Sequence, residues 1–416
     1  MADRRSMALT VLALAFLFNF ISRGLADSFL VFMLAFEKTF GWSHAALAGV
    51  YSVYLLTLGA CAPMTGMLID RLGPRAVYLV GLVLLAASLC AASFANSLLG
   101  IYLSLGLGTG MACSALGMVP AAALIGRWFD RNLSTALGFA YAGFGSGILL
   151  MVPLSQYLID AIGWRETYRW LTAALLVLIP IVAFLPWRLL SQGRGLASGD
   201  SARQSDTDLG PTPVDLHWTI RSAVRSSPFW LLVQVFFFTA AGMHCVIVQT
   251  VAYLVESGYR AIDAAAAFGT AGMLSIVGVL ATGVLSDRFG HRRVALASFA
   301  GTMSGMVALY ASGKLAAAGL LAVYILAFGV SQGARGPIVS ALANRIFRSG
   351  PAASIFGLIF MLMSFGSALG AWVSGLLHQM TGSYDMAFVF SALCLLIAAA
   401  PFIFPSPIAS GMKERS

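Results

Sequence analysis

Long apolar runs alternate with short polar segments along the chain. Twelve of these runs have about 20 residues or more, the length that an α-helix needs to cross the hydrocarbon layer of a membrane. Most of the polar segments are too short to fold on their own. The pattern therefore predicts an all-α membrane protein with twelve transmembrane helices, at residues 7–36, 44–68, 76–95, 98–122, 133–161, 170–189, 229–256, 264–285, 294–312, 317–342, 354–378 and 386–404.

One polar segment, residues 190–227, is much longer than the others. It includes SQGRGLASGDSARQSDTDLGPTP and is rich in Gly, Ser, Asp and Pro. A segment of this composition cannot bury enough apolar surface to fold, so we expect a flexible linker. The linker divides the chain into two six-helix bundles, at residues 1–189 and 228–416.

The composition agrees with a membrane protein and excludes several other classes. Hydrophobic residues make up 59% of the chain and charged residues only 10%, whereas soluble domains are about 25% charged. The five cysteines lie in apolar runs without metal-ligand spacing. There is no phosphate-binding loop, zinc motif, nucleophile elbow or haem motif, so we expect neither an enzyme nor a cofactor.

The lysines and arginines predict the orientation of the chain. With a cytoplasmic N-terminus, 18 of the 25 lie in cytoplasmic segments, and two, Arg23 and Arg335, lie inside spans. The other five lie in the opposite loops, at Lys38, Arg165, Arg169, Arg260 and Lys314. This bias places both termini on the cytoplasmic side of a cell (inner) membrane. It also explains the net charge of +9, so the basic surplus does not indicate binding of nucleic acid.

A loop motif occurs twice in the chain. Residues 66–75 read GMLIDRLGPR and residues 283–292 read GVLSDRFGHR, so Asp287 follows Asp70 by 217 residues. Pro337 follows Pro120 by the same interval. Two halves in the same orientation indicate a parallel repeat, and substrate sites in such proteins lie near the membrane midplane between the halves.

The duplicated loop allows two interpretations. It is either an ordinary tight turn that obeys the positive-inside rule, or a latch that opens and closes as the halves rock. An aspartate at a neighbouring helix N-terminus is stabilised by the helix dipole, and the arginines bind carboxylates or carbonyls. Two copies at matching positions favour the latch, which we assign to Gly66, Asp70, Arg71, Arg75, Gly283, Asp287, Arg288 and Arg292.

The duplicated loop resembles the signature of the major facilitator superfamily, and the resemblance covers the whole chain. It implies a transporter of two pseudo-symmetric bundles that works by alternating access. Residues 127–143, RWFDRNLSTALGFAYAG, also look like the fifth-helix signature of the monocarboxylate transporter family. The matching residues are Trp128, Phe129, Arg131, Gly138, Ala140, Ala142 and Gly143.

The sequence also departs from related patterns. The acidic-Gly-Gly-aromatic motif of the first helix of that family is absent, as is the Asp and Arg pair of its eighth helix. The related oxalate–formate exchangers use a basic residue in helix eleven, and span 11 here has none. The proton–drug antiporters carry Gly-Pro-x-x-Gly-Gly in helix five, where this chain has GFGSG and Pro153.

Three charged residues lie deep inside spans, and such residues are functional candidates because they are costly in a bilayer. Arg23 and Asp27 are four residues apart and share a helix face. They are either a self-neutralising pair that lets span 1 insert, or a substrate-binding arginine with a proton-coupling aspartate. Arg335 has no acid in its own span. It is either a structural arginine or a ligand of an anion.

Several polar residues are further candidates for the substrate site. His244 follows Asp27 by the repeat interval of 217 residues, so both would lie at similar depth in the two halves. It is either a hydrogen-bonded core histidine or a second proton-coupling and substrate-binding group. Gln249, Gln332 and Tyr141 are the other substrate-binding candidates.

Two buried arginines against one buried acid favour an anionic substrate, because guanidinium forms bidentate hydrogen bonds with carboxylate. We therefore expect a monomeric secondary transporter in the bilayer that moves a small monocarboxylate, such as a 2-hydroxy or 2-oxo acid, together with a proton. One alternative is a proton-driven exporter of amphipathic drugs or siderophore-like metabolites. A membrane-embedded sensor or enzyme has no supporting site in the sequence.

Overall fold

The computed structural model describes residues 2–129, 132–192, 218–315 and 317–404, and these are almost entirely helical. Ten of the described helices are long and apolar enough to cross a membrane. In chain order the elements are α1 (Ala2–Asp27), α2 (Phe29–Phe40), α3 (His44–Phe94), α4 (Leu98–Ile101), the π-helix η1 (Tyr102–Gly108), α5 (Thr109–Leu116), α6 (Met118–Gly126), α7 (Leu133–Ile162), α8 (Trp164–Ala183), α9 (Trp187–Gln192), α11 (Ile220–Val224), α12 (Ser227–Glu256), α13 (Ala261–Phe289), α14 (His291–Leu315), α15 (Ala318–Gln332), α16 (Arg335–Ile346), α17 (Ala352–Thr381) and α18 (Asp385–Ile403).

The two copies of the loop motif form equivalent turns. Helix α3 contains a non-helical residue, Gly73, with φ of 79°. Gly290, which follows it by 217 residues, separates α13 from α14 with φ of 88°. Glycine adopts positive φ without the steric cost that a side chain would add. Predicted spans 44–68 and 76–95 correspond to the two parts of α3, on either side of Gly73.

The fourth helix of each half is interrupted at the same place. Gly117, with φ of −89° and ψ of −139°, separates α5 from α6. Ala334, at the repeat interval from Gly117, lies in the short break between α15 and α16. Pro120 and Pro337 each occupy the third position of the helix that follows. Proline is tolerated there because the first-turn amides have no partner within the helix. Span 317–342 therefore corresponds to α15 and α16.

The predicted linker lies largely outside the described residues. Its first residues belong to α9 and residues 220–224 form α11, whereas residues 193–217 are not described. Arg131 of the fifth-helix signature and the C-terminal tail from residue 405 also lie outside the described residues.

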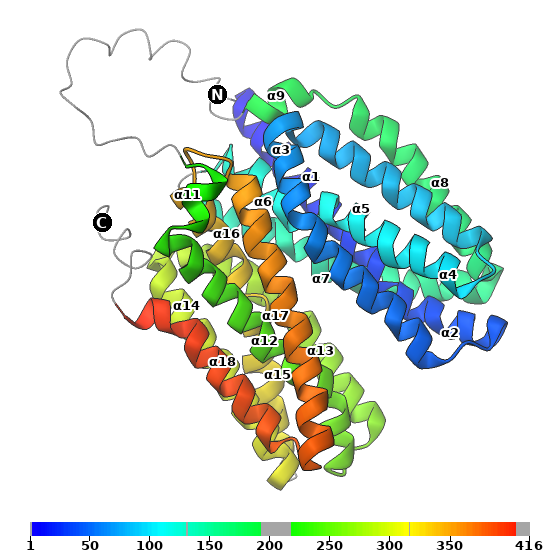
Figure 1. Ribbon diagram of the computed structural model, residues 1–416, viewed down its shortest axis with the longest axis vertical. Helices are drawn as coiled ribbons and strands as arrows, with labels where there is room; N and C mark the ends of the chain where they lie inside the picture. The colour runs from blue at the N-terminus through cyan, green and yellow to red at the C-terminus, as the bar shows by residue number, and fades with distance from the viewer. Residues whose placement is uncertain (1, 130–131, 193–217, 316, 405–416) are drawn as a thin grey trace.

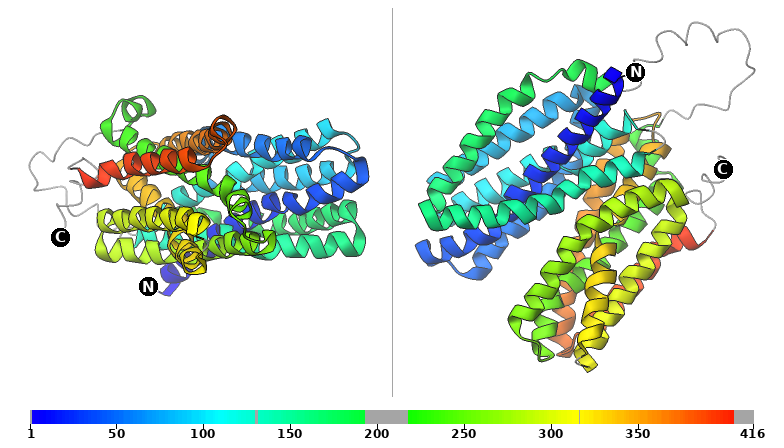
Figure 2. Two further views of the ribbon diagram at one scale, coloured as in Figure 1. Left: turned by 90° about the horizontal axis from the view of Figure 1, so that it is seen from below. Right: turned by 180° about the vertical axis from the view of Figure 1, so that it is seen from behind.

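The helices form two groups, α1–α9 and α11–α18. The groups lie close together at the end of the molecule that holds α9, α11 and the start of α1, and they diverge toward the opposite end (Figure 1). The view from behind in Figure 2 shows the same divergence. The amino-terminal and carboxyl-terminal halves of the chain thus converge toward one end.

Small residues let the halves approach closely where they meet. A Cβ atom on Gly66 of α3 would lie 2.3 Å from the carbonyl oxygen of Ala353 in α17, and one on Gly283 of α13 would lie 2.6 Å from that of Ser134 in α7. No real Cβ tolerates such distances, so glycine is required at both contacts. Small residues serve helix pairs in membranes in this way because packing there depends on close backbone contact.

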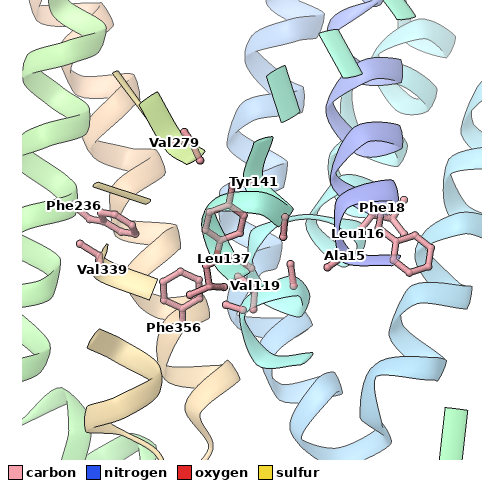
Figure 3. Packing of buried hydrophobic residues seen from close by; sticks show 14 of the residues in the cluster. Ala15, Phe18, Leu116, Val119, Leu137, Tyr141, Phe236, Val279, Val339 and Phe356 are labelled. Carbon is pink, nitrogen blue, oxygen red and sulfur yellow. The ribbon is translucent and has the colours of Figure 1, made fainter. Parts of the chain in front are cut away.

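Buried apolar side chains fill the same region from both halves. Leu137 and Tyr141 of α7 lie beside Val119 of α6, and Phe356 of α17 and Val339 of α16 face them from the other half (Figure 3). All five are at most 3% exposed. The halves therefore share a packed core at the end where they converge.

Candidate functional site

The ion pair of the N-terminal half lies at the end of α1. Arg23 Nη2 is 2.9 Å from Asp27 Oδ2. The hydroxyl of Tyr51 donates to Asp27 Oδ1 at 2.7 Å, and Arg23 Nη1 donates to the hydroxyl of Tyr54 at 3.4 Å. Both carboxylate oxygens of Asp27 thus have partners, and the residue is 4% exposed. The Arg23 side chain keeps 28% exposure, so the guanidinium is the accessible member of the pair.

Local sequence explains this geometry. Arg23 and Asp27 are one helical turn apart, and Asp27 is the last residue of α1 before the chain is interrupted at Ser28. Tyr51 and Tyr54 are three residues apart on α3, which places both hydroxyls on one face. Helices α1 and α3 therefore bring a neutral pair and two phenols together.

Arg335 is the first residue of α16 and is 2% exposed. Its Nη1 donates to the carbonyl oxygen of Ser298 at 3.1 Å and to the hydroxyl of Thr302 at 3.0 Å, both on α14. Its Nη2 donates to the same Thr302 hydroxyl at 3.0 Å and lies 2.9 Å from the sulfur of Met243 on α12. The guanidinium also lies over the Phe299 ring, 4.8 Å from its centroid.

These partners of Arg335 are all neutral. Within the described residues, no carboxylate forms an ion pair with Arg335. Burying an unpaired charge is expensive, and a hydrogen-bonded neutral shell recovers part of that cost. The sequence marks Arg335 as a candidate but not Met243, Ser298 or Thr302, because nothing in their local pattern identifies them as its partners.

His244 lies on α12 beside Met243, with Nδ1 3.0 Å from the carbonyl oxygen of Ala240. It is near enough to Arg23 of the other half for an electrostatic interaction. The structure therefore brings His244 toward the ion pair of α1. Gln249, further along α12, donates to the hydroxyl of Ser374 on α17 at 3.3 Å. Gln332 ends α15 and is half-buried.

Tyr141 has a different place from the other substrate-binding candidates. Its hydroxyl donates to that of Ser340 on α16 at 2.9 Å, so this hydrogen bond joins the two halves. The side chain is 3% exposed and belongs to the packed core between the halves (Figure 3). Tyr141 therefore lies at the interface between the two halves.

The motif aspartate of the N-terminal half reaches a helix of the C-terminal half. Asp70 Oδ2 accepts hydrogen bonds from the backbone N–H of Ser354 at 2.9 Å and from its hydroxyl at 2.5 Å. Ser354 is the third residue of α17. A carboxylate at this position satisfies an amide that has no partner within the helix and is stabilised by the helix dipole.

The second motif aspartate makes the reciprocal contact. Asp287 Oδ2 accepts from the backbone N–H of Thr135 at 2.7 Å and from its hydroxyl at 2.8 Å, and Oδ1 accepts from the N–H of Ser134 at 3.3 Å. Ser134 and Thr135 begin α7 of the N-terminal half. Arg345 Nη2 is 3.9 Å from Asp287 Oδ1, and His291 Nε2 is 3.0 Å from the Ser134 hydroxyl. Each half thus caps one helix of the other.

The motif arginines contact their own halves instead. Arg75 donates to the carbonyl oxygen of Ala183 at the end of α8, at 3.1 Å. Arg292 donates to the carbonyl oxygens of Phe402 and Ile403 at the end of α18, at 2.7 and 2.9 Å. Cations are favourable at helix C-termini. Arg71 and Arg288 are exposed.

Comparison with known proteins shows where this architecture belongs. The family model of the major facilitator superfamily matches residues 12–362 and 274–415. Monocarboxylate transporter 13 of Bos taurus is 30% identical over 381 residues, covering 91% of this chain and 85% of the relative. Monocarboxylate transporter 11 of Mus musculus is 30% identical, covering 93% and 84%.

Solved structures show the same fold. The proton:xylose symporter XylE superposes with a TM-score of 0.75 at 13% identity, over 96% of each chain. The E. coli fucose:proton symporter FucP superposes with a TM-score of 0.68 at 15% identity, over 95% of this chain and 97% of that one. The chain is therefore a multi-pass membrane protein that belongs to the major facilitator superfamily, in its monocarboxylate transporter branch.

Proposed function

We propose that the protein is a monomeric secondary transporter that moves a small monocarboxylate or related organic anion together with a proton. In this proposal twelve spans form two six-helix bundles, at residues 1–189 and 228–416, joined by a cytoplasmic linker at 190–227. Both termini lie on the cytoplasmic side of the cell (inner) membrane. The names of the relatives support transport of a monocarboxylate. They do not favour the exporter of drugs or siderophore-like metabolites.

One observation carries the choice of an anion. Arg23 is neutralised by Asp27, whereas Arg335 is buried among neutral partners. Within the described spans, the positive charge of Arg23 is therefore balanced by an acid, whereas that of Arg335 is not. A monoanionic substrate supplies the missing charge, and a carboxylate suits a guanidinium in geometry as well as in charge.

The arrangement of the halves supports alternating access. Asp70 and Asp287 join the halves at the end that holds α9 and α11, and the halves diverge at the other end (Figure 1). We infer that this conformation is closed toward the cytoplasm. Rocking to the opposite state would break both aspartate caps and the hydrogen bond between Tyr141 and Ser340.

Counterflow tests the proposed function directly. Proteoliposomes loaded with unlabelled pyruvate or lactate are expected to take up external labelled lactate, because exchange needs no driving force beyond the loaded substrate. Lactamide, which lacks the carboxylate, is the matched control and should neither exchange nor compete. Absence of counterflow with every small monocarboxylate tried would reject the proposal.

The latch interpretation predicts a specific defect in Asp70→Asn and Asp287→Asn. Asparagine keeps the size of the side chain but loses the charge, and a cap of this kind is worth about 1–2 kcal/mol. Such a loss changes the ratio of the two transport states about 5- to 30-fold. We expect exchange rates to fall by a similar factor while substrate affinity changes little, as measured separately in liposomes.

Asp160→Asn is the matched control for these variants. Asp160 is an exposed residue of α7 that accepts a hydrogen bond from Gln156, far in sequence from either motif. Its replacement should leave the rate unchanged. Wild-type rates in both motif variants would show that the loops are ordinary tight turns.

A further inference from the structure

Arg335 has one hydrogen-bonding edge that its protein partners leave nearly empty. Thr302 accepts from both Nη1 and Nη2, and Ser298 accepts from Nη1, so the far end of the guanidinium is held by α14. The side edge of the guanidinium is formed by Nε and Nη2, and it has fewer partners. Nε is buried without a hydrogen-bond partner among the described residues. Apart from Thr302, Nη2 contacts the Met243 sulfur at 2.9 Å.

On this edge the Nε–H and one N–H of Nη2 are parallel, so they can donate to the two oxygens of one carboxylate. Arginine and carboxylate frequently join through two parallel hydrogen bonds of this kind. A thioether sulfur is a weak acceptor and satisfies one donor at most. A guanidinium that is 2% exposed therefore keeps one strong donor unused and another weakly used.

Met243 is suited to be displaced. Methionine has three rotatable bonds and an unbranched side chain, so it adapts its shape at little cost. Met243 is buried on α12 next to His244, which interacts electrostatically with Arg23 of the other half. Met243 thus contacts Arg335 and adjoins in sequence a residue that interacts with the ion pair of α1.

We propose that the Met243 thioether holds the place of the substrate carboxylate on the side edge of Arg335. The entering carboxylate displaces the sulfur and accepts from Nε and Nη2 together, while Ser298 and Thr302 hold the guanidinium in position from α14. Met243 is then the specificity-determining residue of this subsite. The inference rests on the proposed function, to which it adds the atoms that receive the carboxylate.

A carboxylate tethered at position 243 tests the inference. Glutamate is similar in length to methionine, so in Met243→Glu its oxygens reach the edge that the sulfur occupies. We expect the purified variant to melt at a higher temperature than Met243→Gln, which has the same shape without the charge. We also expect the pyruvate-induced rise in melting temperature to be lost, with affinity at least 100-fold weaker than in the wild type.

Two further variants separate this effect from the general effect of a buried acid. Met33→Glu introduces an acid at another buried methionine, on α2, and should lower the melting temperature. Met243→Glu combined with Arg335→Gln leaves the new carboxylate unpaired, and should melt below Met243→Glu alone.

The outcomes distinguish this inference from the proposed function. If Met243→Glu is no more stable than Met243→Gln, or binds pyruvate as the wild type does, the assignment of the edge is wrong even when the wild type exchanges monocarboxylates. If the wild type neither binds nor exchanges any monocarboxylate, the proposed function fails. The melting comparison between the glutamate and glutamine variants then still decides whether the edge of Arg335 accepts a carboxylate.

Discussion

Arg335→Ala is expected to abolish transport of monocarboxylates while the protein remains in the membrane. Removing one member of a buried, hydrogen-bonded charge pair costs about 2–5 kcal/mol, which is roughly 30-fold to several thousand-fold in affinity. The cost to folding should be smaller. The partners of the guanidinium are neutral, so its removal leaves no buried charge without a partner. Counterflow and pyruvate-induced thermal shifts measure the two losses independently.

Arg335→Lys makes the same prediction sharper. Lysine keeps the positive charge but is a point donor that cannot form the planar fork. We expect the variant to fold and to bind monocarboxylates far more weakly than the wild type. Arg260→Ala is the control, since Arg260 is an exposed arginine that pairs with Asp263 at the surface. Normal transport by Arg335→Ala would make Arg335 structural and would remove half of the argument for a carboxylate substrate.

Much of the architecture follows from the sequence because membranes constrain chains strongly. An apolar run must be helical in lipid, so run length alone locates the spans. The duplicated loop predicts the parallel repeat, and Gly73 and Gly290 indeed form equivalent turns. The interruptions of the fourth helix of each half were not predicted, because a helix break within an apolar run changes neither its length nor its hydropathy. The paired prolines, Pro120 and Pro337, mark those breaks only once the structure is known.

The partners of the candidate residues could not be read from the sequence. Tyr51 meets Asp27 and Ser354 meets Asp70 through tertiary packing of separate helices, and no local periodicity encodes such contacts. Serine and threonine are common in apolar spans, so Ser298 and Thr302 carry no signal of their own. Tyr141 likewise donates to Ser340 of the other half, a contact that no pattern in the sequence marks.

The charge balance of the described site links these observations. Arg23 and Asp27 form a neutral ion pair when no substrate is bound. Arg335 has only neutral partners among the described residues. A substrate carboxylate bound to Arg335 completes the balance without disturbing the pair. A carboxylate that instead reaches the more exposed Arg23 competes with Asp27 for it. Only the second event changes the environment of Asp27, so proton coupling requires contact between the substrate and Arg23.

In that second case, Asp27→Asn is expected to separate exchange from accumulation. When the substrate draws Arg23 away, Asp27 loses its cation in a low-dielectric setting and takes up a proton, so substrate and proton load together. Asparagine keeps the size and the hydrogen-bonding oxygen but cannot bind that proton. The variant should exchange substrate for substrate, yet no longer accumulate it. For one proton per substrate, an imposed gradient of one pH unit sustains about tenfold accumulation in the wild type, whereas the variant should remain near equal concentrations.

Tyr51→Phe is the matched control for this experiment, because it removes the hydrogen bond to Asp27 Oδ1 and leaves the carboxylate in place. It should still accumulate substrate against the gradient, although at a reduced rate. His244, on the other half and within electrostatic reach of Arg23, is the other proton-coupling candidate. Uphill accumulation by Asp27→Asn at the wild-type level would therefore assign coupling elsewhere. Arg23 and Asp27 would then be an ion pair that neutralises itself so that the first helix can enter the membrane.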